Sequence, residues 1–163
     1  MRVLLAIDGS SFSTAAVEEV AQRPWPVGAE IRIISVAQPP LVARPETWEL
    51  PVDFAEQMEK AVLDRAQPVV DIAAQRLREA LGARIKTSAA VLLGHPKQAI
   101  IDEAERWRAD LVVVGSHGQS ALTRFLLGSV SQTVASHARC SVEIVRDRKT
   151  SHRWKRRAGF SER

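Results

Sequence analysis

The feature that most constrains the fold is the alternation of short apolar runs with segments of helical spacing. Five runs rich in Val, Ile and Leu span residues 3–7, 30–36, 84–92, 110–114 and 141–145. Strands that alternate with helices form a parallel sheet with helices on both faces. The first and fourth runs contain the unbroken apolar stretches VLLAI and LVVV, which are typical of central strands buried on both sides. The sequence therefore predicts an α/β fold.

The segments between these runs predict four helices. In the longest, residues 54–81, apolar side chains recur every three or four positions up to Gly82, and Pro68 is expected to kink or divide the helix. The other three are a helix after the first strand capped by Ser11 or Ser13, a helix that begins near Pro96, and a helix from about Ser129 to Ala138.

Positive charge is concentrated at the C-terminus. Residues 146–163 hold eight Lys and Arg against two acids, so the rest of the chain carries −2 of the total charge of +4. We therefore expect one domain over residues 1–146, and a basic, disordered and solvated tail over residues 147–163. Because Trp154 lies among the basic residues, contact of the tail with nucleic acid or an anionic membrane is an alternative. It is not favoured, because no basic face continues onto the body.

The rest of the composition fits a cytoplasmic protein. Cys140 is the single cysteine, so no disulfide can form within the chain. It precedes a buried strand, where cysteine usually acts as a small apolar residue. The N-terminal apolar run has five residues, too few for a secretory signal or a membrane span. Residues 37–52 hold four prolines and predict an extended connection on the surface.

The most informative segment is GSHGQSALTRFLLGS, residues 115–129, which follows the fourth strand. Ligands of open α/β sheets bind beside the carboxyl ends of the strands, and Asp8 leaves the first strand at the same edge. Glycines permit positive φ and a close approach to an anion, while the start of the next helix offers free N–H groups. The segment therefore fits a phosphate cradle. On its own the segment favours the simpler interpretation, glycines that form turns after a strand.

The whole constellation resembles the universal stress protein family. Nucleotide-binding members of that family carry G-2x-G-9x-G-[S/T] after the fourth strand, and Gly115, Gly118, Gly128 and Ser129 match this pattern. The resemblance covers residues 1–146. It implies a single Rossmann-like domain whose five parallel strands follow the order 3-2-1-4-5, with helices on both faces.

The resemblance also implies an ATP site. Asp8 corresponds to the residue that contacts the ribose, and Val36 to the residue whose backbone meets adenine. The base and ribose side comprises Ala6, Ile7, Asp8 and Val36. The phosphate side comprises Val114, Gly115, His117, Gly118, Gly128, Ser129, Val130 and Ser131. We expect Mg²⁺ to arrive with the nucleotide and no metal site made of protein ligands alone.

These features lead us to expect a stress-response protein in which bound ATP biases conformation or partner binding. The segment lacks the Lys that follows the last glycine of a P-loop, so any hydrolysis should be weak. A slow ATPase or phosphotransferase, with His117 or Asp8 assisting and Ser129 or Ser131 as phosphate acceptor, is the alternative. The strand at 141–145 is an expected sheet edge, and family members dimerise through it, so we expect a homodimer.

Overall fold

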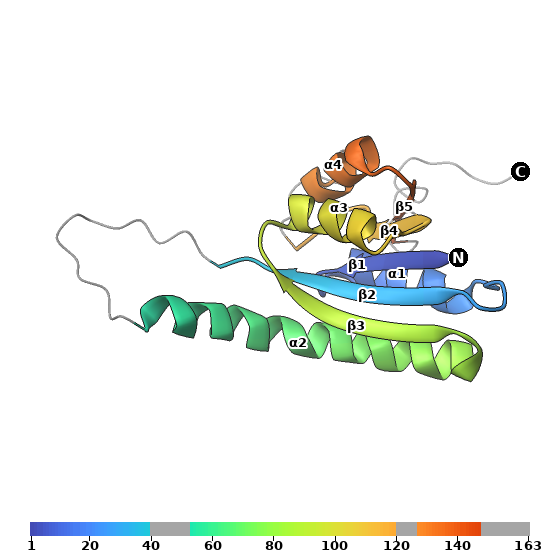
Figure 1. The fold of residues 1–163 in the computed structure, drawn as a ribbon, viewed down its shortest axis with the longest axis horizontal. Coiled ribbons are helices and arrows are strands. Elements are labelled where there is room, and N and C mark those ends of the chain that lie inside the picture. The colour runs from blue at the N-terminus through green and yellow to red at the C-terminus, as the bar shows by residue number, and fades with distance from the viewer. Residues whose placement is uncertain (40–52, 120–126, 148–163) are drawn as a thin grey trace, which may run out of the picture.

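The computed structural model describes residues 1–39, 53–119 and 127–147, which form three layers with a parallel sheet in the middle (Figure 1). The sheet has the order β3-β2-β1-β4-β5. Its strands are β1 (Arg2–Ile7), β2 (Glu30–Ala37), β3 (Lys86–Leu93), β4 (Leu111–Gly115) and β5 (Ser141–Val145). The helices are α1 (Ser11–Gln22), α2 (Phe54–Leu81), α3 (Pro96–Arg106) and α4 (Ser129–His137). The predicted fold class and strand order are confirmed.

Parallel pairing brings the carboxyl ends of the central strands to one edge of the sheet. Ala6 of β1 lies opposite Ile34 of β2 and Val114 of β4. The chain therefore leaves β1 and β4 at neighbouring points, directly after Ile7 and Gly115. Every loop that follows a strand is delivered to this edge.

Successive side chains of the strands enter two separate cores. Leu4 and Leu5 are both fully buried, but Leu5 packs under α1 and α2 whereas Leu4 packs under α3 and α4. The two pairs of helices lie on opposite faces of the sheet (Figure 1). Each fully buried Leu contributes roughly 2 kcal/mol through the hydrophobic effect. The central strands read as unbroken apolar runs because both of their faces are covered.

Three local expectations about element boundaries are wrong. Helix α2 is not divided at Pro68, whose exposed position lets water bond the carbonyl group that loses its helical donor, and the expected kink stays a prediction. The cap of α1 is Ser10, whose Oγ accepts from the N–H of Ser13 at 3.2 Å. Strand β3 begins at Lys86, because Gly82–Arg84 forms a short 3₁₀ turn, η1. Among the described helices, none is long and apolar enough to cross a membrane.

Most of the extended connection expected over residues 37–52, namely residues 40–52, lies outside the described residues. So do residues 148–163 of the expected tail and residues 120–126 of the glycine segment.

An ion pair between Arg23 and Glu143 links the edge strand β5 to the end of α1. Arg23 follows the last residue of α1 and donates two hydrogen bonds to the carboxylate of Glu143, at 2.7 and 2.6 Å. The hydrogen bond with Glu143 raises the pKa of the Arg23 guanidinium above its usual range. Both side chains are about one-third exposed, at 31% and 28%. The paired geometry makes this contact stronger than a typical surface ion pair.

We expect Glu143→Gln to lower the free energy of unfolding by about 1 kcal/mol, because the amide cannot accept both guanidinium hydrogen bonds. Hydrogen exchange should quicken at the amides of β5. Glu105→Gln is the control, because Glu105 meets the largely exposed Arg139 at 3.2 Å and should contribute a few tenths of a kcal/mol. Urea unfolding and hydrogen exchange measure both effects. Equal stability losses in the two variants would contradict this role for Glu143.

Candidate functional site

A cavity of about 1090 Å³ lies at the carboxyl edge of the sheet. It is formed by the ends of β1, β2 and β4, the start of α4, the start of α3 and one side of α2. All twelve residues that we expected at a nucleotide site line it: Ala6, Ile7, Asp8, Val36, Val114, Gly115, His117, Gly118, Gly128, Ser129, Val130 and Ser131. Their convergence is a property of the fold, and their contact with a nucleotide stays a prediction.

Two walls of the cavity were missed by the sequence analysis. The amino-terminal half of α2 runs past the sheet edge (Figure 1), so part of its apolar stripe faces the cavity instead of the sheet. The residues it adds are Val62, Arg65, Ala66 and Val69, and the start of α3 adds His95, Pro96 and Lys97. The predicted strand before Pro96 was the available sign, because a helix that follows a strand of a parallel sheet begins at the carboxyl edge.

Asp8 joins two loops through its carboxylate. Oδ1 accepts from the N–H of Ser10 at 3.0 Å, and Oδ2 accepts from the N–H of Gln119 at 2.9 Å. The side-chain amide of Gln119 also donates to the carbonyl oxygen of Asp8. The carboxylate is therefore a turn acceptor and a bridge between the segments after β1 and β4. Each oxygen keeps a second lone pair, which leaves room to accept from a sugar hydroxyl.

The three fingerprint glycines are needed for close packing of the protein against itself. A Cβ atom would lie 2.8 Å from the carbonyl carbon of Phe12 at position 115 and 2.8 Å from Oδ2 of Asp8 at position 118. At position 128 it would lie 3.1 Å from Cα of His117. None of the three has positive φ, so that expectation is wrong for them. Close approach, not a left-handed conformation, accounts for these glycines.

His117 presents an unused nitrogen inside the site. Its Nδ1 lies 3.1 Å from Oγ of Ser116, and its ring packs on Phe12 with centroids 4.9 Å apart. Nε2 is buried and has no hydrogen-bond partner in the described part of the chain. A buried polar atom without a partner is costly, so this nitrogen would gain from a ligand atom that reached it. The described residues contain no group of three His, Cys, Asp or Glu side chains that could hold a metal ion.

The start of α4 offers backbone N–H donors, whereas the hydroxyl of Ser131 already donates within the protein. Ser131 is buried, and its Oγ donates toward the carbonyl oxygens of Ser116 and Gly128, at 3.1 and 2.9 Å. Gly128, the residue before the helix, provides no side-chain cap. The first-turn N–H groups of α4 therefore point out of the helix end without an intrahelical acceptor. Together with the helix dipole they favour an anion at this position.

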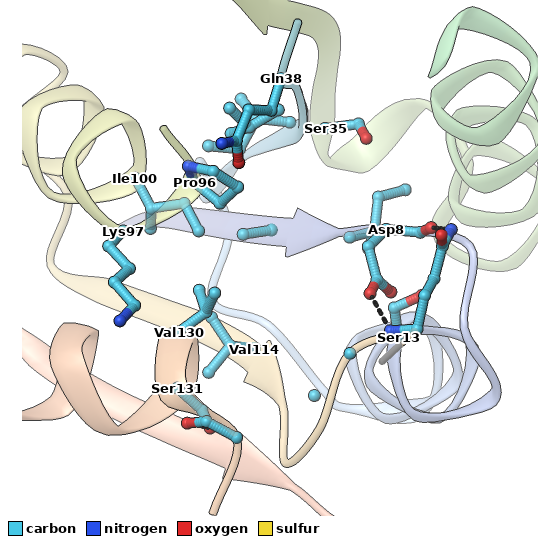
Figure 2. A pocket seen from close by; sticks show the side chains of 18 of the residues that line it. Asp8, Ser13, Ser35, Gln38, Pro96, Lys97, Ile100, Val114, Val130 and Ser131 are labelled. Atoms are coloured by element: carbon cyan, nitrogen blue, oxygen red, sulfur yellow. Dashed lines mark hydrogen bonds between the residues drawn. The ribbon is translucent and has the colours of Figure 1, made fainter. Parts of the chain in front are cut away.

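Charge is unevenly distributed over the cavity. Asp8 is the only acid among the described lining residues, and Arg65 and Lys97 are the cations. Figure 2 shows Asp8 on one side, and Lys97 on the other beside Val130 and Ser131. The cavity thus has Asp8 at the exit of β1 and a basic end, Lys97, at the starts of α3 and α4, while Arg65 adds a second cation from α2. A ligand with a hydroxylated part and an anionic part matches this arrangement.

We expect Gly115→Ala to destabilise the protein by about 1–3 kcal/mol, because the new methyl group would press on the backbone of Phe12. Gly118→Ala should cost less, about 1 kcal/mol, because the side chain of Asp8 can turn away at the expense of one hydrogen bond. Urea unfolding followed by circular dichroism compares the two. A Gly115→Ala variant as stable as the wild type would contradict the close-packing explanation.

The comparisons with known proteins agree with the fold. The sequence model of the Universal stress protein family matches residues 1–146. A universal stress protein of Methanocaldococcus jannaschii is 30% identical over 148 residues, which are 89% of this chain and 81% of the relative.

Solved structures lead to the same family. A universal stress protein in complex with cAMP is 28% identical, with a TM-score of 0.60 over 89% of this chain and 96% of the other. An Arabidopsis thaliana member of the family with AMP bound has a TM-score of 0.64 at 19% identity, over 90% of this chain and 91% of the other, and it shows the shared fold. The sequence match, the strand order and the cavity at the strand ends agree, and the chain belongs to the universal stress protein family.

Proposed function

We propose that this chain binds ATP in the cavity at the carboxyl edge of the sheet, and that occupancy biases its conformation or its binding to a partner. The observation that carries this proposal is the convergence of twelve residues from separate segments on one cavity. Asp8 lies where a ribose can be held, and the glycine segment and the first turn of α4 lie where phosphates can be held. Mg²⁺ would travel with the nucleotide, because the described lining has no second carboxylate to share it.

The solved relatives support an adenine nucleotide as the ligand class. One of them is a complex with cAMP and another holds AMP. The base would lie beside Ala6 and Ile7, with the backbone of Val36 along its edge. ATP is our choice within this class because the glycine segment and α4 supply more donors than one phosphate needs. The cavity volume of about 1090 Å³ is large enough for a nucleoside triphosphate.

The contact between Asp8 and Gln119 suggests how occupancy would change the conformation. The same carboxylate would accept from the ribose and from the N–H of Gln119, so the link between the two loops would share its acceptor with the ligand and its strength would differ between the free and bound states. A ligand shifts a conformational equilibrium only through a difference in affinity between states. Loops that share one acceptor with the ligand provide such a difference.

A homodimer is part of the proposal. Strand β5 is at the edge of the sheet, and its outer side has no strand partner among the described residues. Such an edge favours pairing with a second chain. Because β4 connects the glycine segment to β5, a change at the cavity would reach the dimer interface through one strand pair. We also propose a cytoplasmic location.

We expect Ser129→Asp to weaken ATP binding at least about tenfold, because a carboxylate there would repel the phosphates at close range. Ser129 is exposed and begins α4, where an acidic residue favours the helix, so the fold should be preserved. Isothermal titration with ATP and Mg²⁺ measures the effect.

Ala135→Asp is the matched control. It places the same charge on an exposed position of α4 that lies more than a turn farther along the helix and does not line the cavity, and it should leave affinity nearly unchanged. Wild-type affinity in both variants would place the phosphates elsewhere. A wild-type protein that binds no adenine nucleotide would overturn the proposed function.

A further inference from the structure

Lys97 is positioned at the basic end of the cavity. It is the second residue of α3, and it lines the cavity together with Gly128, Ser129 and Val130. In Figure 2 its side chain extends from the start of α3 toward Val130 on α4, and its nitrogen points into the space between the two helices. Its ammonium group is therefore directed at the place where an anionic part of a ligand would end.

No side chain of the described residues neutralises this ammonium group. The ion pairs of the described chain involve Arg23, Arg32, Arg76, Arg106 and Arg139, and no hydrogen bond of Lys97 is found there. Asp8, the one acid of the described lining, lies on the opposite side of the cavity (Figure 2). Its oxygens already accept from Ser10 and Gln119. Lys97 is exposed, so its charge is solvated in the free protein and is available to a ligand in the cavity.

The surroundings of Lys97 repeat the same preference for anions. Neither α3 nor α4 has a side-chain cap, since His95 and Gly128 make no cap hydrogen bond. The uncapped amides at the starts of α3 and α4 thus lie beside the ammonium group of Lys97, on the side of the cavity away from Asp8.

We propose that Lys97 makes the affinity of this site rise with the number of phosphates, so that it takes a nucleoside di- or triphosphate in preference to a mono- or cyclic phosphate. The inference rests on the proposed function. If Asp8 holds the ribose, the first phosphate lies near the glycine segment and only a longer chain reaches Lys97. Lys97 is in this sense a specificity-determining residue and not a general anchor for the nucleotide.

The test is isothermal titration of the full chain with ATP, ADP and AMP at constant Mg²⁺ and salt. Lys97→Gln should raise the Kd for ATP about tenfold or more, the usual effect of losing a hydrogen bond to a charged group. It should raise the Kd for AMP less than about threefold, because Coulomb attraction weakens with distance. Lys97→Arg, which keeps the charge, should retain most of the preference for ATP.

Lys86→Gln is the matched control. It removes the same charge from an exposed position at the start of β3, at the opposite edge of the sheet, and should alter none of the three affinities. Equal losses for ATP and AMP in Lys97→Gln, or no loss for either, would overturn the inference while leaving nucleotide binding intact. A wild-type protein that binds none of the three nucleotides would overturn both the inference and the proposed function.

Discussion

The carboxylate of Asp8 links the two loops on which the whole site depends. The register of β1 against β4 delivers both loops to one edge, but it does not fix the distance between them. That distance is set by the hydrogen bond from the N–H of Gln119 to Oδ2 of Asp8 and by the absence of a side chain at Gly118. Hydrogen bonds to an ionised acceptor are about twice as strong as neutral ones. The walls of the cavity therefore keep their spacing without a ligand.

The polar groups at the cavity divide into those that the fold uses and those that it leaves free. Asp8 and the hydroxyl of Ser131 are bonded to backbone groups, and Gly118 is required by close packing. Lys97 and Nε2 of His117 have no partner in the described chain. The second group is the better guide to a ligand, because Nε2 of His117 is buried without a partner and Lys97 is an exposed cation at the cavity. The charge of Lys97 suits an anion.

The predictions from sequence succeeded for the fold class and failed for contacts between distant segments. The α/β class and the central position of β1 and β4 followed from periodicity, because burial on both faces leaves an unbroken apolar run. The resemblance placed all twelve site residues on one cavity. The wall from α2 was missed because the distance by which this helix extends past the sheet edge depends on tertiary packing. The three glycines of the segment are instead constrained by close contacts, with backbone atoms at Gly115 and Gly128 and with the side chain of Asp8 at Gly118. Contacts between distant segments are not visible in a local pattern.

The central claim is that adenine nucleotides bind between the loops after β1 and β4. The most direct test is a ¹H–¹⁵N correlation spectrum of the full chain during titration with ATP and Mg²⁺. The account predicts that shift changes concentrate at residues 8–10, 115–119 and 128–131, while the amides at the start of β3 stay in place. Changes confined to residues 147–163, or no changes at saturating ATP, would contradict it.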